Sequence, residues 1–485
     1  MKRCERSQKP PKPRAIATKC LGDVVNRVRC YEAAHGIFSF PRQDGSRKHR
    51  KRNRMSEHNL PFTLLAREGD VRPVSEDRAS FDIAADLPST ISPPLAALEP
   101  SDTSASVTLE LREDLTSLEP EWTAFQRTAA CTVFQTFEWL AKWQQHVGTL
   151  RGTRPAIMLG RDAHGVLLLI LPLAVEKRGP TRRLTWLGSD LCDYNAPLIT
   201  RDFWRHVGDF AALWREAQGL LQSNPRLRFD FVDLQKMAET VGGERNPLLS
   251  LSTQRNASSA HVATLGGSWD EFYKAKRSSE TRKKERKQLR RLGELGDVRF
   301  IDVGHKPEIA RTIETLMQQK SKTFARMGVE DLFARPGYRA FWLDVATTLR
   351  GVTHASRLDV GPTIAATSLG LTHRGCYYLV LSSYYDGEVM RFGPGRAHLH
   401  ELLRHAIEHG IRNFDFTIGD EPYKRDWADI EVRLYDHLQA ATLRGAIVVT
   451  MISAYRRTKR LIKTTPILWR AYSKVREIAR FLRLR

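Results

Sequence analysis

The chain has 485 residues, and its 77 Lys and Arg against 55 Asp and Glu give a formal net charge of +22. The excess is confined to the ends, because residues 1–54 carry +12 and residues 444–485 carry +11, which leaves −1 for residues 55–443. A body without net positive charge gives no argument for nucleic-acid binding, and the length suffices for two domains with extensions.

Residues 1–104 are expected to be disordered: a basic leader, with Met55 as an alternative start, and then a linker rich in Ser, Pro, Asp and Ala. The leader lacks the apolar segment of a secretory signal, and the longest apolar runs, 166–175 and 446–455, are half of the ~20 residues that a membrane span requires. The six cysteines form no Cys-x-x-Cys pair, and no spacing predicts a metal site. These features indicate a soluble cytoplasmic protein without structural disulfides or metal.

The first ordered domain is expected over residues 105–265. Its pattern predicts a strand, two helices, a β-hairpin, a strand, a helix and a strand, at 107–111, 118–128, 138–147, 156–176, 183–187, 203–222 and 227–234. A polar loop at 188–197 contains Asp193, Tyr194 and Asn195. These three residues are candidates for contacts with an acceptor substrate, and an Asx turn that holds the loop is the alternative.

The second domain, residues 266–443, repeats this order. A basic helix over 269–292, with Ser268 as its N-cap, is followed by a strand, two helices and three strands, at 298–303, 306–326, 338–349, 354–360, 363–372 and 376–383. The cations at 274–291 are typical of a solvated helix face and also of a phosphate or anionic-polymer contact. Similar Phe-Asp-Phe segments at 229–231 and 414–416 indicate that the two domains are a duplication, with chance similarity between two buried strands as the alternative.

The tail, residues 444–485, reads as a basic amphipathic helix. Thr465 is expected to be an N-cap, with Pro466 at the first helical position. Such a helix packs on the second domain, remains a soluble and mobile basic tail, or contacts anionic lipid at a membrane surface.

Most of the chemical information lies in residues 379–427. An apolar strand is expected to run directly into Gly393-Pro394-Gly395, followed by a helix and a second strand at 413–418. A glycine turn into a helix N-terminus presents free backbone N–H groups and a positive dipole end to phosphate. Titratable and aromatic side chains follow the second strand. The pattern therefore predicts a transferase that holds a phosphate-bearing donor.

Residues 107–441 resemble a tandem GNAT acyltransferase. The residues that carry the resemblance are FQTFEWL at 134–140, CDYNAPL at 192–198, SKTFAR at 321–326, GPGR at 393–396 and FDFTIGDEPYKRDW at 414–427. The chain is similar to the branch often encoded with bacterial cellulose and exopolysaccharide genes, which is related in layout to the Fem-type peptidyl transferases. The resemblance implies an α/β fold class with mixed α+β sheets, arranged as two tandem GNAT-like acyl-CoA N-acyltransferase domains.

The resemblance also implies where the donor binds. The sheet would splay between two central strands to admit the pantetheine arm of acyl-CoA, and backbone amides at the following helix would hold the pyrophosphate. The cradle residues would be Gly393, Gly395, Arg396 and Ala397. Pro394 departs from the usual Arg/Gln-x-x-Gly-x-Gly/Ala loop and removes one N–H donor. Acyl-CoA would be a co-substrate, and no permanently bound cofactor is expected.

Four residues near the second strand are candidates for catalysis. Asp415, Asp420 or Glu421 would act as the general base or hold the acceptor, and Tyr423 would protonate the departing thiolate. Each residue also has a structural alternative, such as a backbone contact for Asp415 and a capped turn for the two acids that follow.

Two further residues are candidates for substrate binding. Lys424 would contact an acidic acceptor or phosphate, or be a solvated charge. Trp427 suits stacking on a sugar ring, although such a tryptophan is more often part of a core.

The expected function is transfer of an acyl group, acetyl by default, from acyl-CoA to an amine or hydroxyl of a glycan- or amino-sugar-related acceptor, in exopolysaccharide or cellulose biosynthesis. One alternative is a Fem-type peptidyl transferase that uses aminoacyl-tRNA, although the charge distribution gives no argument for nucleic acid. Another is a non-catalytic scaffold that docks on a membrane-associated synthase through residues 444–485.

Overall fold

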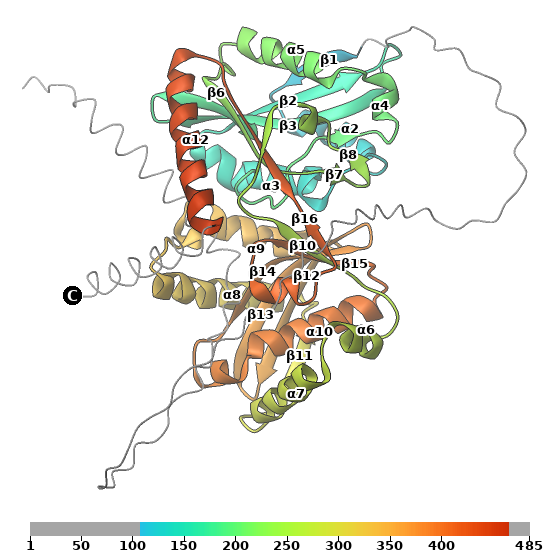
Figure 1. Cartoon of the computed structure of the whole chain (residues 1–485), viewed down its shortest axis with the longest axis vertical. Coiled ribbons are helices and arrows are strands. Elements are labelled where there is room, and N and C mark those ends of the chain that lie inside the picture. Colours follow the sequence, from blue (N-terminus) through green and yellow to red (C-terminus); the bar gives the residue numbers. More distant parts are fainter. Residues whose placement is uncertain (1–106, 465–485) are drawn as a thin grey trace, which may run out of the picture. The chain divides into compact units, whose positions relative to one another are not determined.

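The computed structural model describes residues 107–464, which belong to one compact unit. Helices surround two mixed β-sheets (Figure 1), which confirms the predicted α/β class. The predicted leader and linker, the alternative start Met55, and the predicted cap of Thr465 and Pro466 lie outside the described residues.

The first sheet is built mainly from the first half of the chain. Its strand order is β1 (Thr108–Arg112), β2 (Arg154–Arg161), β3 (Leu167–Arg178), β4 (Thr181–Trp186), β6 (Phe231–Ala238), β17 (Leu434–Ala440) and β9 (Thr253–Arg255), and β5 (Leu198–Ile199) pairs with β3. A separate two-stranded ribbon consists of β7 (Thr240–Val241) and β8 (Glu244–Arg245). The hairpin predicted over 156–176 is confirmed, since β2 and β3 pair antiparallel.

The second sheet has the same arrangement of strands. Its order is β11 (Val298–Asp302), β12 (Thr353–Val360), β13 (Thr363–His373), β14 (Cys376–Tyr384), β15 (Asn413–Ile418), β10 (Ala260–Thr264) and β16 (Ile430–Val432). In both sheets only the fourth and fifth strands of this order are parallel, namely β4 with β6 and β14 with β15. This shared order and direction confirm the predicted duplication.

The two sheets exchange strands. β10 precedes the expected boundary at residue 265, yet it pairs with β15 in the second sheet. β17 lies before residue 443, yet it pairs with β6 in the first sheet. The predicted ranges 105–265 and 266–443 therefore do not coincide with the sheets, because each sheet takes its sixth strand from the chain of the other half.

The helices of the first half follow the predicted order, but they are shorter and more often interrupted than predicted. They are η1 (Thr116–Leu118), α2 (Glu119–Phe125), η2 (Val133–Gln135), α3 (Phe137–Trp143), the π-turn η3 (Gln144–Gly148), η4 (Thr149–Arg151), α4 (Phe203–His206), α5 (Phe210–Ser223) and η5 (Pro247–Ser250). The helix predicted over 203–222 is broken between α4 and α5. Asp209 starts a new helix there, because its carboxylate accepts hydrogen bonds from the amides of Ala211 and Ala212.

The second half contains the longer helices. They are α6 (Trp269–Lys276), α7 (Ser279–Gly293), α8 (Lys306–Met327), η6 (Leu332–Ala334), α9 (Tyr338–Thr348), η7 (Glu388–Phe392), α10 (Pro394–Glu408), α11 (Pro422–Arg425) and α12 (Leu443–Thr464). Ser268 caps α6 in a capping box with Glu271, as predicted. The basic helix predicted over 269–292 is interrupted, since Arg277 is extended and Ser278 caps α7.

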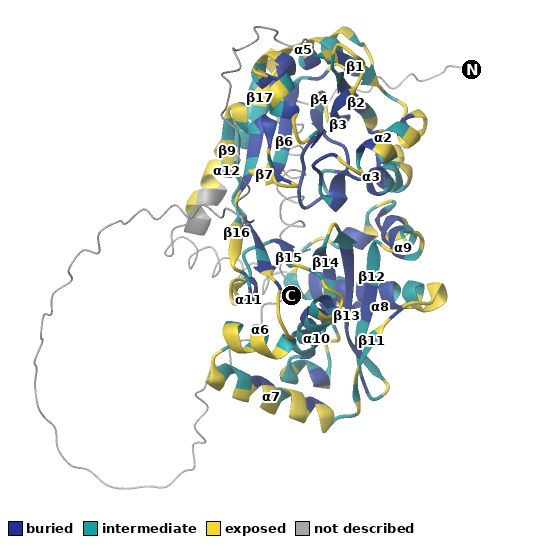
Figure 2. Cartoon of the chain, turned by 90° about the vertical axis from the view of Figure 1, so that its right-hand side faces the viewer, coloured by how far each residue is buried: buried dark blue, intermediate teal, exposed yellow. Residues whose placement is uncertain are grey.

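A shared hydrophobic core joins the two halves. Trp139 of α3 packs edge-on against Phe341 of α9, with ring centroids 5.1 Å apart. Beside this pair, Asp344 accepts from Lys142 at 2.9 Å and lies 2.8 Å from His146. Figure 2 shows the strands of both sheets as mostly buried, whereas α7 is mostly exposed. The contact between α3 and α9 is therefore apolar at its centre, and charged side chains form ion pairs at its margin.

The last described helix, α12, packs on β6 and β17 of the first sheet (Figure 1). Its Arg456 pairs with Asp233 of β6 at 2.7 Å and with Asp436 of β17 at 3.8 Å. The start of the predicted tail therefore packs on the first sheet, not on the second domain. No helix among residues 107–464 is long and apolar enough to cross a membrane.

Candidate functional site

The second sheet opens between its two central strands. β14 and β15 pair in parallel only at Cys376–Asn413, Tyr377–Phe414 and Tyr378–Asp415, although both strands continue beyond these positions. The strands therefore diverge after Tyr378 and Asp415. This is the splay that the sequence analysis expected, and Asp415 lies at its apex.

The helix expected to hold the donor phosphates is α10. The prediction that the preceding strand runs directly into Gly393 is wrong, because β14 ends at Tyr384 and η7 fills the interval. Gly393 is the N-cap in the left-handed region, with φ of 70°, and it has no side chain to cap the helix. The helix N-terminus is thus left without a side-chain cap.

The four predicted cradle residues, Gly393, Gly395, Arg396 and Ala397, lie together at this terminus. The amides of Arg396 and Ala397 already donate to the Gly393 carbonyl, at 3.0 and 3.2 Å. Pro394 has no N–H, so Gly395 carries the amide that the helix itself does not use. The Arg396 side chain is turned toward α7, where its Nη1 donates to Gln288 at 2.5 Å. The α10 terminus therefore offers a phosphate fewer free backbone N–H groups than the four predicted cradle residues would suggest.

Helix α7 adds positive charge beside this terminus. It packs against η7, the segment that ends at Gly393. Its buried side chains are Glu285 and Leu292, whereas Lys283, Lys284, Arg286, Lys287, Arg290 and Arg291 are all exposed. A cationic helix next to an uncapped helix N-terminus favours an anionic ligand.

The equivalent place in the first half is closed. There, α5 leads into β6 as α10 leads into β15. The α5 terminus is already occupied by the Asp209 carboxylate, which accepts from two amides at 2.9 and 3.1 Å. A carboxylate at this position would repel a phosphate. Of these two equivalent helix N-termini in the described part of the chain, that of α5 is therefore capped by a carboxylate and that of α10 is not.

Asp415 is positioned by a residue of the other half. The Tyr194 hydroxyl donates to both carboxylate oxygens of Asp415 at 2.8 Å, and the Thr417 amide donates to Oδ1 at 2.7 Å. Both side chains are only 4% exposed. Burial raises the pKa of Asp415 to about 7, against the lowering effect of these hydrogen bonds. Burial and Asp415 raise the pKa of Tyr194 well above its ordinary value, so the phenol stays protonated.

The backbone beside Asp415 is strained. Thr417 has a φ of 59°, a conformation that β-branched residues rarely adopt. The Asp415 carboxylate and the Lys424 ammonium hold this conformation, since they bond to the Thr417 amide and carbonyl respectively. Strain of this kind at a strand end is typical of functional sites.

Lys320 is a buried site residue that the sequence analysis missed. It lies on α8, is 2% exposed, and donates from Nζ to the Ser382 carbonyl at 3.2 Å, on the part of β14 beyond the splay. Burial lowers its pKa to about 7, although Glu421 acts in the opposite direction. A lysine on a predicted helix usually indicates a solvent-exposed position. The one sequence feature that pointed to Lys320 is its position next to the SKTFAR segment at 321–326.

The predicted first-half residues all lie in a buried loop. Asp193 is 2% exposed. Burial lowers the pKa of Lys236 and raises the pKa of Asp415, and the charge of Asp193 acts upward on both pKa values. Asn195 has a holding role, because its Nδ2 donates to the Gln235 carbonyl at 3.1 Å and its amide to Lys236 at 3.0 Å. Tyr194 thus faces the second half, while Asn195 attaches the loop to β6.

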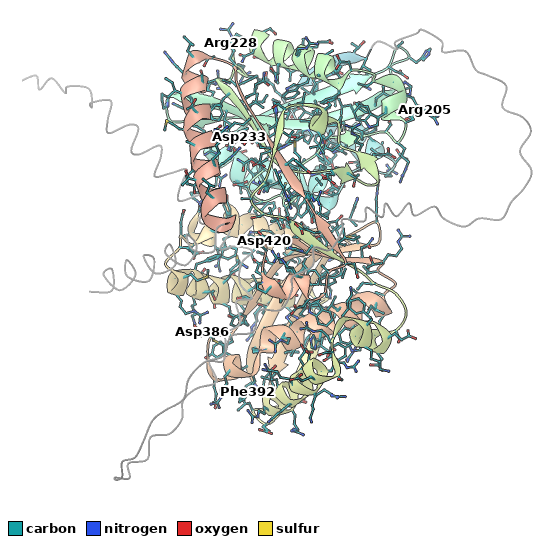
Figure 3. The ribbon with its side chains drawn as sticks, in the orientation of Figure 1. Arg205, Arg228, Asp233, Asp386, Phe392 and Asp420 are labelled. Atoms are coloured by element: carbon teal, nitrogen blue, oxygen red, sulfur yellow. The ribbon has the colours of Figure 1, made fainter. Side chains whose placement is uncertain are left out.

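Two acids and a lysine follow β15. Glu421 pairs with Lys424 at 3.1 Å, and Lys424 also donates to the Ile418 carbonyl at 2.9 Å. Lys424 is buried, which excludes the alternative of a solvated charge. Asp420, which is labelled in Figure 3, accepts from the Ser259 amide at 3.3 Å and lies 3.9 Å from Nε2 of His261. These contacts bring charged groups together just beyond the splay.

The two predicted aromatic residues are buried. Tyr423 packs edge-on against Phe416, and burial raises its pKa well above the ordinary value. Trp427 is 1% exposed and packs in parallel with Phe272 and Tyr273, beneath the Arg277 guanidinium. The prediction that Trp427 stacks on a sugar is therefore wrong, because its faces are covered by α6.

Comparison with known proteins adds a family to this geometry. Residues 279–425 match the family model described as an acetyltransferase (GNAT) domain. This range contains α7, the splay, α10 and Asp415. No curated protein matches the sequence.

Several solved structures share weak similarity with the chain. The crystal structure of FemX is 12% identical, covering 67% of this chain and 96% of that one, with a TM-score of 0.48. A tandem GNAT protein from the clavulanic acid biosynthesis pathway is 12% identical over 69% and 98%, with a TM-score of 0.37. A GCN5-related N-acetyltransferase from Sphaerobacter thermophilus is 13% identical over 69% and 97%, with a TM-score of 0.33. These values are too low to transfer a substrate.

Proposed function

We propose that this chain, a tandem GNAT-superfamily acyltransferase whose matched domain spans residues 279–425, transfers an acyl group from acyl-CoA to an amine or hydroxyl of a glycan- or amino-sugar-related acceptor. The donor binds in the second half, at the α10 terminus and the splay. The acceptor binds beyond the splay, in contact with the loop of Asp193 and Tyr194 and with Glu421 and Lys424. An acceptor in exopolysaccharide or cellulose biosynthesis is part of the proposal.

The observation that carries this proposal is the buried Tyr194–Asp415 pair at the apex of the splay. A carboxyl with a pKa of about 7 is a suitable general base near neutral pH, because it is partly ionised and yet accepts a proton readily. An ordinary carboxylate on the surface would be too weak a base for the same task.

The proposed reaction balances with the groups at hand. The acceptor nitrogen or oxygen attacks the thioester carbonyl carbon while Asp415 takes its proton. The C–S bond then breaks, and the departing thiolate receives a proton from the buried phenol of Tyr423 or from solvent. The products are an acylated acceptor and free coenzyme A. Asp420 and Glu421 are proposed to hold the acceptor, together with Lys424.

The donor assignment rests on the uncapped terminus of α10. The Gly395 amide and the helix dipole would hold the pyrophosphate, and the cations of α7 would contact further phosphate. The same cations would suit an aminoacyl-tRNA donor, which is therefore the alternative that an acyl-CoA experiment must exclude.

We also propose that the protein works in the cytoplasm and contacts an anionic membrane or a membrane-associated synthase through residues 444–485. Within the described part of this segment, Ile447 and Leu461 expose apolar side chains, as does the adjoining Leu443, and Arg444 and Arg457 are exposed cations. Apolar and cationic groups together favour an anionic lipid surface.

A pH profile tests the base. The wild type should acylate a model amino sugar with a kcat/KM that rises as the pH increases through about 7, where Asp415 loses its proton. Asp415→Asn should lower kcat by 10²–10⁴-fold and remove that limb. An unchanged profile in a folded Asp415→Asn variant would exclude Asp415 as the base.

A further inference from the structure

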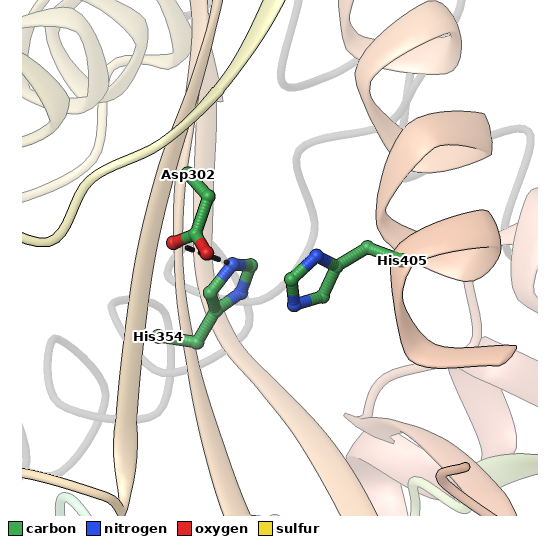
Figure 4. A group of neighbouring side chains, drawn as sticks. All are labelled: Asp302, His354 and His405. Atoms are coloured by element: carbon green, nitrogen blue, oxygen red, sulfur yellow. Dashed lines mark ion pairs between the residues drawn. The ribbon is translucent and has the colours of Figure 1, made fainter. Parts of the chain in front are cut away.

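Three side chains that are distant in sequence converge on one edge of the second sheet. Asp302 ends β11, His354 lies near the start of β12, and His405 lies on α10 (Figure 4). One ligand atom from each residue lies within 4.8 Å of the ligand atoms of the other two. The cluster is about eleven residues, or ~16 Å, along α10 from the donor terminus, and it shares no residue with the acyltransferase site.

The spacing of two of these atoms already fits a shared ion. His354 Nε2 and Asp302 Oδ1 are 3.4 Å apart. Two ligand atoms that bind one tetrahedral zinc ion at ~2.0–2.1 Å are roughly 3.4 Å apart. His405 would approach by a modest rotation, since its ring lies parallel to that of His354, with centroids 4.3 Å apart.

The buried Nε2 of His354 faces the Asp302 carboxylate at 3.4 Å as an ion pair, without the geometry of a hydrogen bond. Its other ring nitrogen, Nδ1, lies 2.8 Å from the hydroxyl of Tyr377, a contact that fixes the ring. Histidine ligands in metal sites are usually oriented in this way through the nitrogen that does not bind the metal. A cation between Nε2 and the Asp302 carboxylate would satisfy both groups.

A fourth side chain adjoins the cluster. The His409 ring stacks on His405 at 3.9 Å, and its Nδ1 lies 2.8 Å from the His405 carbonyl, so its Nε2 faces elsewhere. His409 lies at the C-terminal end of α10, where the helix dipole favours a cation. Asp302 is half exposed, which gives an ion a route to the cluster.

We propose that Asp302, His354 and His405 bind a divalent transition-metal ion, with water or His409 as a fourth ligand. Imidazole and carboxylate donors in this number favour Zn²⁺ over Mg²⁺ or Ca²⁺, which prefer oxygen ligands alone. The ion would join β11, β12 and α10, and so fix the helix that carries the donor terminus. Its role is structural, since none of the three ligands belongs to the acyltransferase site.

No sequence pattern indicates this site, and the expectation of no metal rested on spacing. The ligands are separated by about fifty residues each, and no short motif contains two of them. Only the antiparallel pairing of β11 with β12, and the packing of α10 on β12, bring them together.

The test is a Zn²⁺ titration of the tag-free full-length chain after chelator treatment, with a competing chromophoric chelator. Cys4, Cys20 and Cys30 are replaced by serine throughout, to remove thiolates that bind zinc on their own. The protein should bind one Zn²⁺ at micromolar concentration or below and gain thermal stability. His405→Ala should abolish this site, and Asp302→Asn should weaken it at least tenfold.

Two variants distinguish a specific metal site from adventitious zinc binding. Tyr377→Phe removes only the orienting hydroxyl and should weaken zinc binding by about tenfold or more. His206→Ala is the matched control, because His206 pairs with Asp202 at 3.3 Å elsewhere on the surface and should leave zinc binding unchanged. Equal zinc binding by the wild type, Asp302→Asn and His405→Ala, or no zinc binding by any of them, would overturn the proposal.

Discussion

The Tyr194 hydroxyl donates to both oxygens of Asp415 across 221 residues of sequence, so each half of the chain supplies one member of the central pair. The duplicated first half thus contributes to the site even though its own helix terminus is closed by Asp209. Its proposed role is to position the base of the second half.

Replacement of Tyr194 by Phe tests that role. The hydroxyl lowers the pKa of Asp415, so its loss should raise this pKa further and move the rising limb of kcat/KM to higher pH. A pH series for the wild type and Tyr194→Phe measures the displacement. If the limb stays in place while kcat falls, Tyr194 acts on the substrate and not on Asp415.

Lys320 has a pKa near that of Asp415, and a variant separates the two groups. Lys320→Met removes the titrating ammonium and keeps an unbranched chain in the buried position. The limb near pH 7 should persist in Lys320→Met, since Asp415 remains. Loss of the limb in this variant, with retention in Asp415→Asn, would assign the titration to the lysine.

Asp415 should also lower stability at neutral pH. Its folded pKa, about 7, exceeds its ordinary value of 3.8, so its favourable contribution is complete below pH 3.8 and is lost as the pH rises to 7. Asp415→Asn does not titrate and should therefore exceed the wild type in unfolding free energy by a few kcal/mol above pH 7. Denaturant melts from pH 4 to 8 measure the gap, which should be smallest at pH 4. The exposed Asp297→Asn should parallel the wild type.

Arg456 attaches α12 to the first sheet through Asp233, which is 3% exposed in its side chain and lies on β6 (Figure 3). Arg456→Ala would leave Asp233 with Arg183 at 3.4 Å and should cost up to about 3 kcal/mol at neutral pH. Burial raises the pKa of Asp233, but the two arginines lower it more, so its folded pKa lies below the ordinary value of 3.8. The cost of Arg456→Ala should therefore shrink as the pH falls below 3.8 and Asp233 becomes protonated. Arg457→Ala, an exposed neighbour, should change the unfolding free energy by less than about 0.5 kcal/mol. Equal effects of the two variants would contradict the attachment.

Local patterns predicted most elements but not their partners. The hairpin over 156–176 and the helix over 306–326 follow from alternation and helical spacing, which are local properties. The sheet membership of β10 and β17 depends on contacts between distant segments, and no periodicity encodes it.

The same limit applies to the site. Asp415 and Tyr194 were both predicted, but their hydrogen bond was not, because it joins the two halves. Lys320 was missed and Trp427 misassigned because burial alone decides whether such a side chain is solvated, catalytic or part of a core.

The central claim is that the second half alone holds an acyl-CoA donor, and calorimetric titration of acetyl-CoA and a longer acyl-CoA into the full-length chain tests it most directly. The account predicts one molecule bound per chain, abolished by Gly395→Asp and retained in Gly395→Ala and Asp209→Ala. No acyl-CoA binding by the wild type, or unchanged binding by a folded Gly395→Asp variant, would contradict it.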